Sequence, residues 1–159
     1  MGRFGILIGA TILLSYSTAV AASTWQLERQ VEGFTDTQTV TAFVKSENAK
    51  FMLRCENKDR IMAMFQPEGV ISEAGPLFTR YRIGKHSTVK SENWISLYGI
   101  AAYIGAKKDE KNRQEIIDLA KSLMSGKSIL IEAENQRETF PLTGSKTAIA
   151  EVLSTCGVG

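Results

Sequence analysis

Between residues 25 and 104 the chain alternates between apolar and polar positions, a pattern with the period of two that is typical of β-strands. In Lys50–Glu56, for example, Phe51, Leu53 and Cys55 share one face. Turn residues separate the alternating runs. The pattern predicts strands over Trp25–Val31, Thr37–Val44, Lys50–Glu56, Arg60–Gln66, Leu77–Gly84 and Ser91–Tyr98, with Ile100–Ile104 as an extension of the last.

The period changes to that of an amphipathic helix after the charged run Lys107–Arg113, which we expect to open the helix. Gly126 is typical of the residue that follows a helix. Two further strands are expected over Lys127–Ala133 and Glu138–Leu142. A last helix then starts at an N-cap of Thr143 or Ser145. The apolar stripes of the two helices consist of Ile116, Ile117, Ala120, Leu123 and Met124, and of Ala148, Ile149, Val152, Leu153 and Cys156.

These elements predict an α+β fold, in which an antiparallel, sandwich-like sheet is covered at one side by two helices from the C-terminal third. Most of the expected strands come before both helices in the sequence, as is common in α+β proteins. No interior linker or repeat interrupts residues 23–159, so we expect one domain.

The first 22 residues have the pattern of an export signal. Arg3 precedes the uncharged run Phe4–Leu14, and small residues ending in Ala19–Ala22 follow. We therefore expect residues 1–22 to be removed and the remainder to be periplasmic or secreted. The expected cleavage site contains no cysteine, so a lipid-modified N-terminus is not expected. The apolar run of the signal is too short for a comfortable membrane span, although an uncleaved anchor is the competing interpretation.

Cys55 and Cys156 both lie on faces expected to point toward the core. Outside the cytosol such a pair forms a lasting disulfide, which would join the last helix to the sheet. Two free buried thiols are the alternative. A redox-active pair is less favoured, because such cysteines are usually close in sequence.

The composition excludes some classes of partner. The formal net charge of the chain is only +2, whereas a nucleic-acid-binding protein would need a dominant basic face. Neither a cofactor nor a metal site is expected, since the chain has one histidine and its two cysteines are already assigned.

No complete catalytic motif is present. Gly126-Lys127-Ser128 lacks the earlier glycine of a phosphate-binding loop and stands between a helix and a strand, in the wrong order. Ser87 and Lys90 have the spacing of penicillin-interacting enzymes without the other two elements of that site. His86 could serve a Ser-His-Asp triad, but a histidine in a polar turn is more often simply solvated.

The candidate partner-binding residues form a basic stretch and one aromatic position. Arg80 and Arg82 share a strand face and could meet an anionic partner, although a solvated sheet face is the more common explanation of such residues. Trp94 could line a binding groove or belong to the core. The full set of candidates is Arg80, Arg82, Lys85, His86 and Trp94.

Several segments together resemble the periplasmic TagO/VasI family associated with type VI secretion. They are the strand Met52–Cys55 with its Arg-Cys pair, the strand Arg80–Ile83, the strand around Trp94, and Phe140–Gly144, which leads to a helix and a cysteine. Thr143 stands where serine is usual in that family. Invasion-associated locus B proteins share the late element more loosely. The resemblance implies a small exported accessory protein with a β-rich core, no cofactor and no established active site.

We therefore expect a non-enzymatic accessory or binding protein of the bacterial cell envelope, whose partner is an envelope or secretion-system component. The alternatives are a small envelope hydrolase that uses His86 and a secreted, host-directed effector or inhibitor. The sequence names neither the ligand nor the oligomeric state.

Overall fold

The computed structural model describes residues 24–33, 35–71, 74–108 and 110–158. The expected export signal, residues 1–22, lies outside the described residues. Within the described ranges the chain forms nine strands and two helices. In chain order these are β1 (Gln26–Val31), β2 (Gln38–Lys45), β3 (Ala49–Glu56), β4 (Arg60–Pro67), β5 (Gly75–Ile83), β6 (Val89–Leu97), β7 (Ala101–Ala106), α1 (Arg113–Ser125), β8 (Ser128–Ala133), β9 (Gln136–Pro141) and α2 (Ser145–Thr155).

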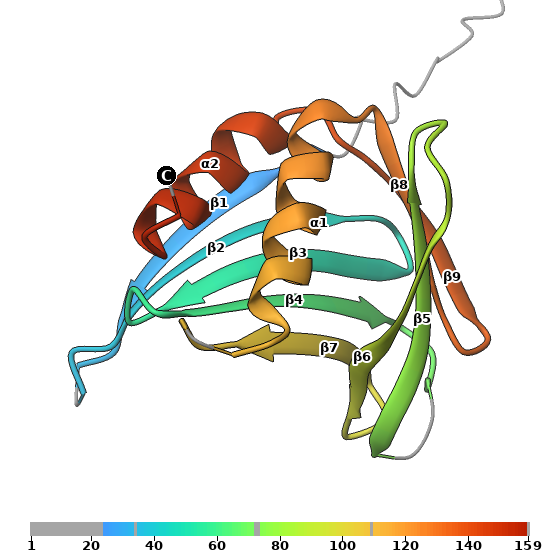
Figure 1. Cartoon of the computed structure of the whole chain (residues 1–159), viewed down its shortest axis with the longest axis horizontal. Coiled ribbons are helices and arrows are strands. Elements are labelled where there is room, and N and C mark those ends of the chain that lie inside the picture. The colour runs from blue at the N-terminus through green and yellow to red at the C-terminus, as the bar shows by residue number, and fades with distance from the viewer. Residues whose placement is uncertain (1–23, 34, 72–73, 109, 159) are drawn as a thin grey trace, which may run out of the picture.

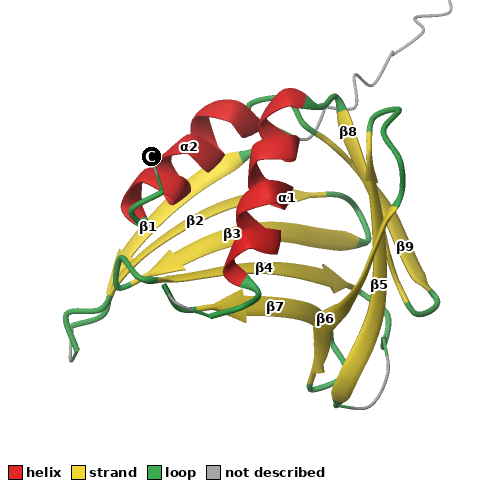
Figure 2. Ribbon diagram, in the orientation of Figure 1, coloured by secondary structure: helices red, strands yellow, loops and turns green. Residues whose placement is uncertain are grey.

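All nine strands belong to one antiparallel sheet, in the order β1-β2-β3-β4-β7-β6-β5-β8-β9. The sheet is strongly bent, so that β1 to β4 and β7 form one layer and β5, β6, β8 and β9 turn away from it (Figure 1). Both helices lie over the concave side of the first layer (Figure 2). The predicted α+β class, with a sandwich-like sheet and helices in the C-terminal part, is confirmed.

Phenylalanine side chains join the two halves of the bent sheet. The ring of Phe140 on β9 lies 6.1 Å from that of Phe51 on β3 and 6.2 Å from that of Phe65 on β4. All three side chains are fully buried. Since aromatic pairs at this separation add to the free energy gained by burial, these contacts hold β9 against the opposite layer.

Two predicted boundaries are wrong, for physical reasons. Ile100–Ile104 does not extend the preceding strand, because Tyr98 and Gly99 form a tight turn with φ values of 55° and 72° and the chain reverses into β7. Of the charged run Lys107–Arg113, only the last residue belongs to α1, which begins at Arg113. That run has no apolar residue that could pack on the sheet.

The expected helix ends also differ in detail. Gly144, with a φ of 81°, is the N-cap of α2, and the hydroxyl of Ser145 donates to the carbonyl oxygen of Leu123 in place of capping the helix. Gly126 does end α1, but with a φ of −81°. A Cβ atom at this position would lie 2.4 Å from Ile83, so close packing requires the glycine.

The disulfide between Cys55 on β3 and Cys156 at the end of α2 is present, with Cα atoms 5.6 Å apart. Both residues are buried, as the sequence predicted. Neither cysteine is free. The bond fastens α2 to the centre of the first layer across a sequence separation of 101 residues. Such a long loop makes a disulfide effective, because the bond strongly restricts the unfolded chain.

We expect replacement of both Cys55 and Cys156 by alanine to lower the free energy of unfolding by about 2–5 kcal/mol, because the unfolded chain regains its entropy. Urea denaturation followed by circular dichroism measures this difference. A reductant should destabilise the wild type to a similar extent and leave the double variant unchanged. Equal stability of the wild type with and without reductant would contradict the stabilising role of the bond.

Candidate functional site

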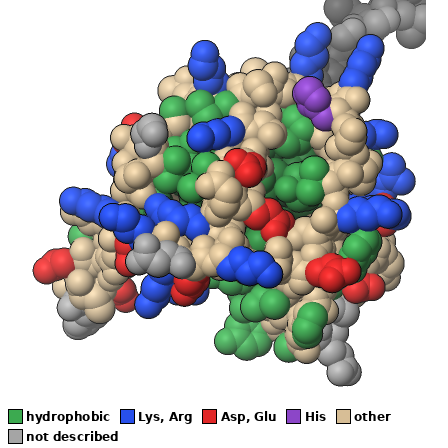
Figure 3. All heavy atoms as spheres, viewed as in Figure 1, with side chains coloured by type: hydrophobic (Ala, Val, Ile, Leu, Met, Phe, Trp, Pro, Cys, Tyr) green, Lys and Arg blue, Asp and Glu red, His purple; other side chains and the backbone are tan. Residues whose placement is uncertain are grey.

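A cleft of about 520 Å³ opens between α1 and the β5–β6 hairpin. Figure 3 shows a hollow beside α1, with hydrophobic side chains at its base and acidic side chains next to it. Its volume lies within the usual range of ligand-binding sites. The cleft is lined by Tyr81, Ile83, His86, Ser87, Val89, Lys90, Glu115, Asp118, Leu119 and Ser122.

The cleft exists because β6 separates from β7 along most of its length. The β6–β7 ladder contains three residue pairs, from Ile95–Tyr103 to Leu97–Ala101. The preceding part of β6, Val89–Trp94, pairs with β5 alone among the described residues. α1 packs on β4 and β7 and therefore stands across the gap from the hairpin.

The base of the cleft is apolar. Tyr81 and Ile83 point inward from β5, since they alternate with the exposed Arg80 and Arg82. Leu119 contributes from α1. All three residues are buried, so they form a hydrophobic surface at the bottom of the cleft.

Two carboxylates border the cleft on its helical side. Glu115 and Asp118 are three residues apart on α1 and so lie on the same side of the helix. Oε2 of Glu115 accepts a hydrogen bond from Nδ2 of Asn93 at 2.6 Å, and Asp118 accepts one from Gln114 at 2.8 Å. Neither carboxylate forms an ion pair with a described residue. Both carboxylates therefore lack a cationic side chain within 4.0 Å in the part of the chain that the structure describes.

Three buried side-chain polar atoms have no hydrogen-bond partner among the described residues. They are Oε1 of Glu115, Oγ1 of Thr79 and Nε1 of Trp94. Thr79 lies two residues before Tyr81 on the inward face of β5. Unpaired buried polar atoms are rare in folded proteins, and of these three residues only Glu115 lines the cleft.

Burial, and to a smaller extent the nearby Glu115 and Asp118 carboxylates, together raise the pKa of Tyr81 to about 12. Both effects disfavour the phenolate, the first by desolvation and the second by charge repulsion. Tyr81 therefore stays a neutral hydroxyl in the cleft at physiological pH.

The structure separates the basic stretch predicted from the sequence onto two sides of the sheet. Arg80 and Arg82 lie on the outer face, where Arg80 forms an ion pair with Glu132. Arg82 borders two shallow depressions there together with Leu130 and Arg137. These arginines share a face, as expected, but that face is opposite to the cleft.

The other predicted residues have three different environments. His86 lines the cleft, and its backbone N–H closes the turn to Ile83. Lys85 is exposed in the same turn. Trp94 is fully buried and belongs to the core, which was the alternative interpretation of this residue. Sequence reasoning missed Glu115, Asp118 and Leu119, because it used only the apolar stripe of α1.

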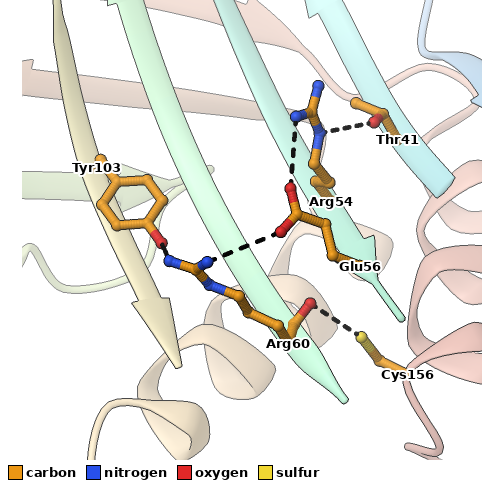
Figure 4. Close-up of polar contacts among 6 residues, drawn as sticks. All are labelled: Thr41, Arg54, Glu56, Arg60, Tyr103 and Cys156. Carbon is orange, nitrogen blue, oxygen red and sulfur yellow. Dashed lines mark hydrogen bonds and ion pairs between the residues drawn. The ribbon is translucent and has the colours of Figure 1, made fainter. Parts of the chain in front are cut away.

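A second polar cluster lies on the outer side of the first layer, around the Arg-Cys strand (Figure 4). Arg54 donates to Thr41 at 3.1 Å and lies 3.7 Å from Glu56, while Arg60 donates to the hydroxyl of Tyr103 at 2.9 Å. These contacts link β2, β3, β4 and β7. The arginine of the Arg-Cys pair therefore has structural partners.

The disulfide adjoins the same cluster. Sγ of Cys156 lies 3.5 Å from the carbonyl oxygen of Arg60. A disulfide sulfur has no hydrogen to donate, so this is a packing contact. Arg113 at the start of α1 donates to the carbonyl oxygens of Asp59 and Cys156, each at 2.7 Å, and so holds α1, β4 and the end of α2 together.

Within the described ranges, no group of three histidine, cysteine or acidic residues is placed to hold a metal ion. None of the helices in those ranges combines the length and apolar character needed to cross a membrane. Comparison with protein-family models, curated proteins and solved structures finds no significant match to this chain. The TagO/VasI resemblance therefore stays a prediction.

We expect a phenolate absorbance titration to show one tyrosine ionising near pH 12 in the folded protein, a step that Tyr81→Phe removes. The Tyr81 hydroxyl has a higher pKa in the folded state than in the unfolded state. Deprotonation of the unfolded chain should therefore lower the free energy of unfolding as pH rises from about 10 to 12. Asp118→Asn should shift the step to lower pH. A wild-type titration without a late step would contradict the burial of this hydroxyl.

Proposed function

We propose that the chain is an exported, non-enzymatic binding protein of the bacterial cell envelope and that its ligand occupies the cleft between α1 and the β5–β6 hairpin. The supporting observation is the cleft itself, whose apolar base lies beside two carboxylates that form no ion pair with a described residue. An apolar pocket with a few polar groups at its border is the usual form of a ligand site.

Two observations support export. The sequence of residues 1–22 has the charge and hydrophobicity pattern of a secretory signal. The buried disulfide is of the kind that persists in oxidising compartments. Together they favour a periplasmic or secreted protein that works with another envelope or secretion-system component. Fractionation of cells distinguishes this role from that of a host-directed effector, which would accumulate in the medium.

The envelope hydrolase is a second candidate, because His86 lines the cleft together with Ser87 and Lys90. We expect neither the purified wild type nor His86→Ala to show turnover of cell-wall or lipid substrates. The measurement is product release over time for both proteins. Turnover by the wild type that is absent in His86→Ala would favour the hydrolase over the binding protein.

We expect Ser122→Trp to abolish ligand retention, because Ser122 is an exposed residue of α1 that lines the cleft and the indole would fill it. Native mass spectrometry after incubation with a bacterial envelope extract measures retention. Lys121→Trp is the matched control, since the neighbouring residue is exposed but does not line the cleft.

Circular dichroism and thermal melting should show that both tryptophan variants fold like the wild type. The proposal predicts a bound species on the wild type and on Lys121→Trp that is missing from Ser122→Trp. Identical retention by all three proteins would contradict the cleft as the binding site.

A further inference from the structure

The side of the cleft formed by β6 is an unpaired strand edge. β6 contains nine residues, but only its last three pair with β7. At Glu92 and Asn93 the β5–β6 ladder has a bulge, which ends the regular edge. The remaining segment, Val89–Ser91, pairs regularly with β5 on one side and with no described strand on the other.

An unpaired edge of this kind can accept another strand. Its backbone N–H and C=O groups that point away from β5 are the same groups that an adjacent strand would use. Natural proteins usually shield such edges, whereas peptide-binding domains use them to add an extended peptide to the sheet. Here the edge is not on the outer rim of the sheet, because Val89 and Lys90 border the cleft.

We propose that the ligand of the cleft is an extended peptide, which binds as an additional strand along Val89–Ser91 of β6. This inference rests on the proposed function, since it names the chemical class of the ligand for the same site. The cleft has room for a few residues, in keeping with the three regularly paired positions of the edge.

The lining of the cleft also specifies the side chains of the peptide. Successive residues of a strand point to opposite faces, so residues i and i+2 of the peptide would both face α1. One of them would contact the apolar base formed by Tyr81 and Leu119. The other would meet Glu115 and Asp118, which form no ion pair with described residues and therefore favour a basic side chain.

The position of the basic residue is set by the location of the carboxylates. Glu115 and Asp118 are both on α1, whereas Lys90 pairs with Arg80 and its side chain lies on the outer face of the hairpin. The basic side chain therefore belongs on the side of α1. The predicted recognition pattern is thus an apolar residue and a lysine or arginine separated by one residue.

The test uses the peptide acetyl-Thr-Leu-Thr-Lys-Thr-amide, with binding measured by calorimetry and by amide shifts of Val89–Ser91. Two derivatives carry one N-methyl group each, on the central threonine or on the lysine. Neighbouring N–H groups of a strand point to opposite sides, so only one derivative should lose a hydrogen bond to β6. That derivative should bind about tenfold more weakly and the other within about twofold.

Two further peptides test whether the cleft distinguishes the side chains of the ligand. Exchanging the lysine with the central threonine moves the charge to the other face and should weaken binding about tenfold, as should norleucine in place of lysine. On the protein, Glu115→Gln combined with Asp118→Asn should remove the preference for lysine over norleucine. Ser122→Trp should abolish binding of the parent peptide, and Lys121→Trp should not.

Three results would overturn the inference: no binding of the parent peptide, equal binding of both N-methyl derivatives, or binding that survives in Ser122→Trp. Failure of the inference is separable from failure of the proposed function. If the peptide does not bind but an envelope species is retained in a manner that depends on Ser122, the cleft is a ligand site for another class of molecule. If neither is retained, both proposals fail.

Discussion

The short ladder between β6 and β7 is the constraint on which the rest of the structure depends. Three residue pairs are the only strand pairing between the two halves of the nine-stranded sheet among the described residues. With so few pairs the sheet can bend sharply there, and the two halves then face each other. The bend is stabilised from the other end, where Phe140 packs between Phe51 and Phe65.

The cleft follows from the same constraint. Before Ile95 in the sequence of β6 the two strands diverge, and Ile104–Ala106 of β7 pair only with β4 among the described residues. The helix returns to the sheet near β4 and β7 rather than against the hairpin. The space left between them therefore has a strand edge on one side and the polar side of a helix on the other. Neither element alone would form a ligand site.

Much of the fold could be predicted from the sequence, because most strands alternate regularly and both helices have a clear apolar stripe. The pairing of Cys55 with Cys156 was also accessible, since each residue lies on a core-facing position of its element. The turn at Tyr98 could not be predicted, because tyrosine rarely adopts a positive φ and apolar residues lie on both sides of it in the sequence. The apolar sequence around Tyr98 favoured a buried side chain, but the residue is 84% exposed.

Less of the candidate site could be predicted. The basic stretch was visible in the sequence, but strand alternation places Arg80 on the outer face while His86 turns toward the cleft. Glu115 and Asp118 looked like ordinary solvent-facing residues of an amphipathic helix. Their role depends on what the helix faces, and that follows from the bend in the sheet, a property of pairing between distant strands that no local pattern encodes.

The disulfide has one more consequence, for the integrity of the molecule. The link from Cys55 to Cys156 encloses the chain from β4 to α2, which includes every residue that lines the cleft. A single protease cut in an exposed hairpin of this region would leave two pieces that remain covalently connected. After a single proteolytic cut, all the residues that line the cleft would therefore still belong to one covalently linked molecule.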